Sequence, residues 1–293
     1  MIEAMRAASW YGDGVDSSEK IVIAEVFKTL VKVKADYGLS ISGQPRLTVL
    51  KSQDWPAMLA STLTHGLFGT YKAGSGREIA LISTASRDWE NEAREALEIA
   101  LEDIGQIESL AGEMKSGSVL IAMELALADR HVCGLAIEEL FVTLIRPDCL
   151  TRGVVIHELV HLSTPAVFSA WFEEGTAYWI SAHIRGALDG ASWEEFRNTD
   201  VMFSTGTPED GVQYSQHSDA GFILYGELAE TLGSTTVGEH IRSVSGGSSG
   251  TQVLESIIRY TPPDKQTEVR NLIYSRCKDK DRFGVDIPCR LPL

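Results

Sequence analysis

Residues 157–161 read His-Glu-Leu-Val-His, a spacing that can place two imidazoles on one face of a helix. Positions four residues apart in an α-helix are separated by about 40° around the axis and about 6 Å along it. His157 and His161 can therefore bind one metal ion together. The intervening Glu158 points off that axis, where its carboxylate can reach a water molecule bound to the metal. The pattern predicts a metal site with its own general base.

A catalytic zinc site usually has three protein ligands and leaves a fourth position to water. The candidates for the third ligand are the adjacent carboxylates Glu173 and Glu174. The 12 residues between His161 and Glu174 are enough to end one helix near Pro165 and to bring a second helix back beside it. Successive helical side chains point about 100° apart, so only one of the two carboxylates can face the metal. We predict Glu174 as the ligand and interpret Glu173, the competing choice, as a solvated carboxylate.

These residues resemble the motif of a known family. Residues 157–161 (HELVH) followed by residues 171–178 (WFEEGTAY) are similar to the gluzincin zinc metallopeptidases, especially the aminopeptidase-like branch and its small bacterial relatives. The resemblance is specific over residues 150–185 and extends weakly in both directions. It implies hydrolysis of a peptide or protein substrate, with Glu158 as the general base and one Zn²⁺ per chain held by His157, His161 and Glu174.

The sequence departs from the family pattern in three places. The gap of 12 residues before Glu174 is shorter than in the large aminopeptidases. Their substrate-amine motif, Gly-Ala-Met-Glu-Asn, has a partial echo at residues 122–124 (AME), which lacks the Gly and the Asn and which we interpret as chance. In the thermolysin-like branch an Asp stands four residues after the third ligand. Tyr178 occupies that position here, so the group that orients His157 is not identified.

The oxyanion formed in such a hydrolysis needs a further hydrogen-bond donor. Tyr214 and His217 are both candidates, since they lie about one turn apart at the start of a predicted helix over residues 214–232. The family resemblance favours Tyr214. Trp171 and Tyr178 are interpreted as packing groups.

Two other classes of function remain open from the sequence. The first is a metal-dependent hydrolase of a non-peptide substrate, because a fold does not fix its substrate. The second is a non-catalytic binding protein that keeps zinc for stability. The presence of Glu158 argues against the second class, since a purely structural site has no use for that residue.

The hydrophobic pattern predicts the elements that position these residues. Strands are expected at residues 46–51, 66–72 and 78–83, with a turn at residues 73–76. The segment 119–145 is ambiguous and fits two helices, or a helix followed by a strand at residues 140–145. Helices are expected at residues 17–37, 55–63, 89–110, 153–162, 172–184, 214–232, 237–244 and 251–260.

This order of elements predicts an α+β fold, and the family resemblance implies a fold of the thermolysin or gluzincin type. A small sheet and the active-site helix come first, and a mostly helical C-terminal subdomain follows. We expect an N-terminal arm and helix over residues 1–44, an α/β catalytic subdomain with both ligand helices over residues 45–186, and a helical subdomain over residues 187–293.

The net charge and the distribution of apolar residues argue against some classes of binding partner. The 293 residues carry a formal net charge of −15, which argues against nucleic acid and anionic membranes as main partners. No stretch approaches the ~18 consecutive apolar residues of a transmembrane helix. The N-terminus lacks a secretory pattern, so the chain as written is expected to be soluble and cytoplasmic, or secreted if a leader has been removed.

Four cysteines are too few for a disulfide scaffold in a chain of this length. Their spacing differs from the CxxC pairs of structural zinc sites. Two disulfides, Cys133–Cys149 and Cys277–Cys289, and four free thiols are equally compatible with the sequence.

Overall fold

The computed structural model describes residues 9–11, 46–48, 65–85, 87–123, 133–138, 141–167, 169–185, 197–206, 211–280, 286–289 and 291. The chain divides into two compact units, one made of residues 1–105 with 114–162 and the other of residues 106–113 with 163–293. The predicted helices over 17–37 and 55–63 lie outside the described residues. The three-part division with boundaries after residues 44 and 186 stays a prediction.

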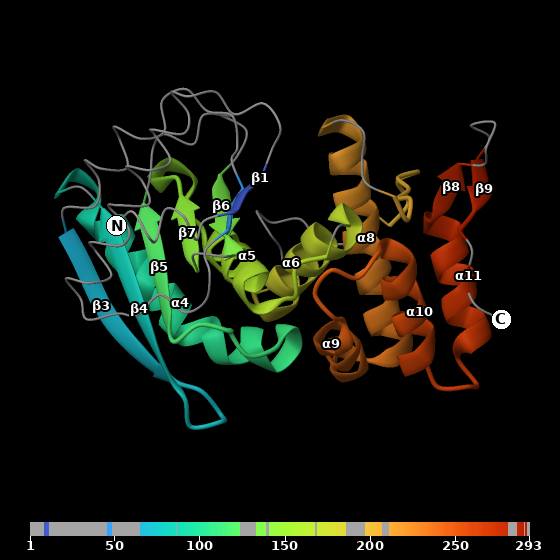
Figure 1. The fold of residues 1–293 in the computed structure, drawn as a ribbon, viewed down its shortest axis with the longest axis horizontal. Helices are drawn as coiled ribbons and strands as arrows, with labels where there is room; N and C mark the ends of the chain where they lie inside the picture. The colour runs from blue at the N-terminus through green and yellow to red at the C-terminus, as the bar shows by residue number, and fades with distance from the viewer. Residues whose placement is uncertain are drawn as a thin grey trace. The chain divides into compact units, whose positions relative to one another are not determined.

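A mixed five-stranded sheet forms the centre of the first unit (Figure 1). The strand order is β3-β4-β5-β7-β6, so that β6 lies at one edge. β4 and β5 are parallel, as are β5 and β7, whereas β3 and β6 each pair antiparallel to their neighbour. The strands are β3 (His65–Lys72), β4 (Glu78–Ala85), β5 (Ser118–Met123), β6 (Gly134–Ile137) and β7 (Val142–Ile145).

The predicted strands at residues 66–72 and 78–83 are confirmed and form an antiparallel hairpin. β3 and β4 are joined by a tight turn in which the Gly76 N–H donates to the Ala73 carbonyl at 2.8 Å, and Gly76 has a φ of 84°. A positive φ is costly for residues with a side chain, which explains the glycine. A further pair of strands, β1 (Ser9–Tyr11) and β2 (Arg46–Thr48), forms a separate parallel ladder.

The expectation of a helix at the start of segment 119–145 was wrong. Residues 118–123 form β5, in which every side chain is buried. A strand covered on both faces is a continuous apolar run without alternation, and periodicity alone cannot distinguish such a run from a buried helix. The alternative of a strand near residues 140–145 is confirmed by β7.

The predicted helices over residues 89–110 and 153–162 are confirmed. α4 (Glu90–Ala111) packs against β3, where the side chain of Leu101 lies over Gly69. α5 (Arg152–Ser163) carries the HELVH segment. Two 3₁₀ turns, η1 (Arg87–Trp89) and η3 (Pro147–Cys149), precede these helices. The buried apolar residues of α5 are Val155, Ile156, Leu159, Val160 and Leu162.

The second unit is mostly helical, as predicted (Figure 1). The predicted helices near residues 172–184, 214–232, 237–244 and 251–260 are confirmed, whereas the last helix and the short hairpin after it were not predicted. The elements are α6 (Ala170–Arg185), α8 (Gly211–Leu232), α9 (Ser234–Ser243), α10 (Gly250–Tyr260), α11 (Gln266–Arg276), β8 (Lys278–Lys280) and β9 (Asp286–Pro288).

Aromatic side chains fill the core of the second unit. Trp171 is fully buried and stacks on Phe203, with the ring centroids 4.5 Å apart. Tyr225 lies parallel to the same indole at 6.4 Å. The interpretation of Trp171 as a packing group is therefore confirmed. None of the described helices carries an apolar stretch long enough to cross a membrane.

All four cysteines are paired. Cys133 bonds to Cys149, and Cys277 bonds to Cys289. The first disulfide connects the residue before β6 to η3, just ahead of α5. The second joins the residue after α11 to the residue after β9. The structure thus decides between the two alternatives that the sequence left open.

Candidate metal centre

The two histidines of α5 face each other across one helical turn. The Nε2 atoms of His157 and His161 lie 3.1 Å apart, and His157 is only 9% exposed. Two nitrogen atoms bound to one tetrahedral zinc ion at ~2.0–2.1 Å would lie about 3.3 Å apart. The spacing of the imidazoles therefore fits a shared ion.

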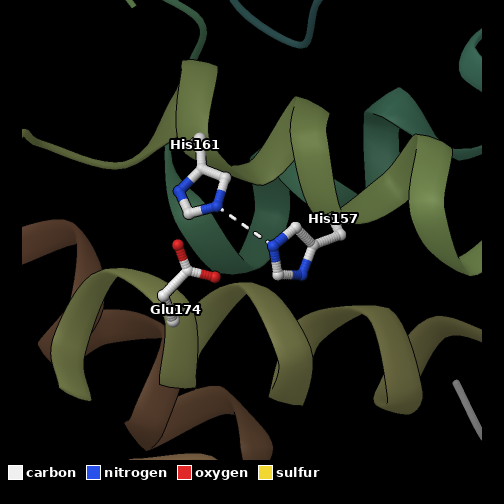
Figure 2. Close-up of side chains that lie close together, drawn as sticks. All are labelled: His157, His161 and Glu174. Carbon is white, nitrogen blue, oxygen red and sulfur yellow. Dashed lines mark hydrogen bonds between the residues drawn. The ribbon is translucent and has the colours of Figure 1, made fainter. Parts of the chain in front are cut away.

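Glu174 of α6 completes a group of three ligand-type side chains. One ligand atom from each of His157, His161 and Glu174 lies within 4.8 Å of the other two. Figure 2 shows the carboxylate and the two imidazoles directed toward one another. Two imidazoles and one carboxylate form a donor set that suits zinc. This chemistry fits the ion that the sequence motif predicts.

The carboxylate of the neighbouring Glu173 binds the backbone instead of joining this group. Its Oε1 accepts a hydrogen bond from the backbone N–H of Val167 at 2.7 Å. This contact ties the segment before α6 to the first turn of that helix. Glu173 is therefore a partly buried, hydrogen-bonded group and not the solvated carboxylate that the sequence suggested.

Glu158 lies on the buried side of α5 and is 5% exposed. Its carboxylate lies directly against Gly134, the first residue of β6. Gly134 was not predicted from the sequence, because a single glycine at the start of a short strand carries no recognisable signal. The partial match to the amine-binding motif, at residues 122–124, overlaps the end of β5, where Ala122 and Met123 are fully buried. Glu124 lies outside the described residues.

Tyr214 stands beside Glu174. Its hydroxyl donates a hydrogen bond to Oε1 of that carboxylate, although the side chain as a whole is 43% exposed. Burial of the hydroxyl end, followed by the negative charge of Glu174, raises the pKa of Tyr214 well above its ordinary value of about 10. Tyr214 therefore stays protonated and remains a donor throughout the neutral range.

His217 lies one turn further along α8 and has another partner. Its Nε2 accepts a hydrogen bond from the backbone N–H of Ser204 at 3.3 Å. Its buried Nδ1 has no hydrogen-bond partner among the residues that the structure describes. Burial lowers the pKa of His217, so the ring is neutral near pH 7 and carries its proton on Nδ1.

Two glycines bring α6 and α8 together. A Cβ atom at Gly221 would lie 1.9 Å from the carbonyl oxygen of Trp171, and a Cβ atom at Gly175 would lie 2.7 Å from the Cα of Gly221. Side chains at these positions would force the two helix backbones apart. The close approach places Tyr214 within hydrogen-bonding distance of Glu174. Gly175 belongs to the sequence motif, whereas Gly221 was not noted.

Tyr178 follows Glu174 by one helical turn. Its ring packs against Phe222 of α8, with the centroids 6.0 Å apart. This contact confirms its interpretation as a packing group.

Solved structures of zinc peptidases share this fold. The chain matches an aminopeptidase A of Legionella pneumophila, solved in complex with aspartic acid, with a TM-score of 0.55 and 15% identity over 67% of this chain and 26% of that one. It also matches an M1 zinc metallopeptidase from Deinococcus radiodurans, with a TM-score of 0.54 and 15% identity over 77% of this chain and 54% of that one.

No protein-family model and no curated protein sequence matches the chain. The chain spans about a quarter and about half of the two peptidases named above. At this identity the similarity establishes a shared fold, that of part of the M1 zinc metallopeptidases, and leaves activity to be argued from the site.

Proposed function

We propose that this protein is a zinc-dependent peptidase that hydrolyses a peptide bond in a peptide or protein substrate. The observation that carries the proposal is the grouping of His157, His161 and Glu174 within 4.8 Å of one another, with Glu158 on the same helix as the two histidines. Zinc in such a site acts as a Lewis acid that acidifies a water molecule and polarises a carbonyl group.

Glu158 is the general base of the proposed reaction. Its carboxylate takes the proton of the attacking water and passes it to the leaving amine. A glutamate next to the first metal-binding histidine of a helix has the position that this task requires. The fold shared with M1 zinc metallopeptidases supports a peptide as the substrate.

Tyr214 is the proposed donor to the oxyanion. Its hydroxyl lies beside Glu174, and its raised pKa keeps the proton available. His217, the second candidate, accepts a hydrogen bond from Ser204 and so supports the neighbouring backbone. This difference favours Tyr214 for the catalytic role.

Metal content and turnover of a mixed quenched-peptide library test the proposal. Wild type, Glu158→Gln, Glu174→Gln and the matched control Glu173→Gln are compared. We expect about one zinc per chain in wild type, Glu158→Gln and Glu173→Gln, and a large loss of zinc in Glu174→Gln. Glu158→Gln should lower kcat by at least about 10²-fold, while Glu173→Gln should stay close to wild type, because an amide oxygen can still accept the Val167 hydrogen bond.

Each contrary outcome has a distinct meaning. Zinc in wild type and Glu158→Gln without cleavage by either would contradict a peptidase and favour another substrate or a structural metal. Absence of metal from wild type and from every variant would contradict the proposed metal centre. Loss of zinc in Glu173→Gln and its retention in Glu174→Gln would exchange the roles of the two carboxylates.

A further inference from the structure

The carboxylate of Glu158 occupies the space in which a side chain at position 134 would lie. A Cβ atom built on Gly134 would lie 2.3 Å from Oε1 of Glu158, and 2.7 Å from both Cδ and Cγ. Real Cβ atoms essentially never lie within 3.0 Å of a heavy atom outside their own residue and its chain neighbours. Any residue other than glycine at position 134 must therefore displace either Glu158 or the backbone of β6.

The backbone of β6 is held in place from two directions. Gly134 pairs with Ile145 in the antiparallel ladder between β6 and β7. The preceding residue, Cys133, is bonded to Cys149, and its carbonyl accepts a hydrogen bond from the Arg146 N–H at 2.9 Å. A retreat of β6 would strain the disulfide or break ladder hydrogen bonds.

Helix α5 is also anchored to its surroundings. At its first residue, Arg152 forms an ion pair with Glu102 and a second one with Asp103, a fully buried carboxylate, at 2.9 Å. Leu159, which follows Glu158, is fully buried. With both backbones anchored, the group that can yield to a new side chain is the carboxylate end of Glu158.

We infer that Gly134 is a positioning residue for the general base: its missing side chain provides the space for Glu158, and the Cys133–Cys149 disulfide keeps β6 at that distance. The inference rests on the proposed function, because it gives Glu158 the task of a base. Proton transfer requires the carboxylate to lie within hydrogen-bonding distance of the attacking water. A displacement of about 1 Å at a reacting group costs on the order of 10²-fold in rate.

Turnover of Gly134→Ala provides the first test. We expect kcat to fall by about 10²-fold, with KM changed by less than about threefold and zinc retained. Gly117→Ala is the matched control, because a Cβ atom at Gly117 meets nothing within 4 Å. That control should keep the kcat of wild type. Unchanged kcat in Gly134→Ala would overturn the inference.

A double-mutant cycle shows whether Gly134 acts through Glu158. In the Glu158→Gln background the base is already absent, so adding Gly134→Ala should cause no further loss of kcat. A further loss as large as that in the wild-type background would mean that Gly134 acts independently of Glu158, which would overturn the inference.

Crystal structures of wild type and Gly134→Ala test the inference without any measurement of activity. We expect the Glu158 carboxylate to move by about 1 Å or more relative to His157, while β6 and α5 stay in place. A carboxylate that keeps its position while β6 shifts would overturn the inference. Absence of peptide cleavage by wild type would contradict the proposed function alone, because the two crystal structures still decide what Gly134 does.

A double variant, measured by thermal unfolding, tests the inference even if Gly134→Ala is too unstable for the other measurements. Gly134→Ala/Glu158→Ala removes the carboxylate that the new methyl group would meet. We expect the double variant to fold and to melt close to Glu158→Ala. A double variant as unstable as Gly134→Ala would show that the new methyl group meets something other than Glu158, and would overturn the inference.

Discussion

The hydroxyl of Tyr214 donates a hydrogen bond to a carboxylate oxygen of Glu174, the proposed third metal ligand. A carboxylate that shares its charge with a cation accepts a weaker hydrogen bond, because its negative charge is partly neutralised. Binding of the metal would therefore make the hydroxyl available to a developing oxyanion. At the scale of single residues, this exchange of acceptor is what the proposed catalytic role of Tyr214 requires.

Tyr214→Phe tests this role directly. Loss of one donor to an oxyanion typically lowers kcat by about 10²–10³-fold, so we expect a fall of that size with zinc content and KM little changed. The control is Tyr274→Phe, which removes the hydroxyl of an exposed tyrosine on α11. Steady-state kinetics of both variants provides the measurement.

His217→Asn in the same assay separates the two candidate donors. The hydrogen bond between His217 and Ser204 links α8 to a backbone segment, so we expect its loss to lower the free energy of unfolding by about 1–2 kcal/mol. The effect on kcat should be much smaller than that of Tyr214→Phe. A large fall in kcat for His217→Asn together with an unchanged kcat for Tyr214→Phe would assign the donor role to His217.

At the scale of elements, the approach of α6 and α8 depends on two glycines. Gly175 and Gly221 leave no side chain between the helices, and the Trp171 carbonyl fills the space in front of Gly221. Backbone atoms cannot rotate away as a side-chain end can. The distance between the two helices is therefore set by these two residues, and with it the contact between Tyr214 and Glu174.

Gly221→Ala should disrupt this approach. Inserting a methyl group into a tightly packed site costs about 1–3 kcal/mol, and a contact with backbone places this site at the upper end of that range or beyond it. We expect the urea midpoint to fall accordingly. Gly246→Ala is the control, since its Cβ atom would find its nearest neighbour at 3.8 Å. Equal stability of the two variants would contradict the role of Gly221.

At the scale of the whole molecule, stability depends on a buried histidine that joins three helices. Nε2 of His240, on α9, lies 3.1 Å from the hydroxyl of Tyr225 on α8, and Nδ1 lies 3.2 Å from Oγ of Ser256 on α10. Complete burial lowers the pKa of His240 to about 3. The native state therefore keeps this ring neutral under conditions in which an unfolded chain would protonate it.

This shift makes stability depend on pH. In the unfolded chain the imidazole titrates near pH 6.5, so the full stability is present above that pH and is lost as the pH falls from about 6.5 toward 3. Each pH unit within that window is worth about 1.4 kcal/mol. We expect wild type to lose about 2 kcal/mol more than His240→Gln between pH 6.5 and pH 5, as measured by urea unfolding. Parallel losses in both proteins would contradict this account.

The sequence by itself determined the features that depend on neighbouring residues. An α-helix places positions four residues apart on one face, so HELVH predicted the pairing of His157 and His161 without any tertiary contact. The turn at residues 73–76 was equally local, because glycine alone adopts its backbone conformation freely. The α+β order and the long helices followed from apolar periodicity in the same way.

Only the tertiary structure decided the features that join residues distant in the chain. The backbone N–H of Val167 donates a hydrogen bond to Glu173, whereas Glu174 groups with the two histidines. The sequence predicted Glu174 as the ligand but took Glu173 for a solvated carboxylate, because the contact with Val167 depends on how the chain folds back before α6. For a related reason, the sequence did not determine the strand β5, the pairing of the cysteines or the contact between Gly134 and Glu158. Hydrophobic periodicity indicates which face of an element is buried. These features depend instead on which residues of another element pack against that face.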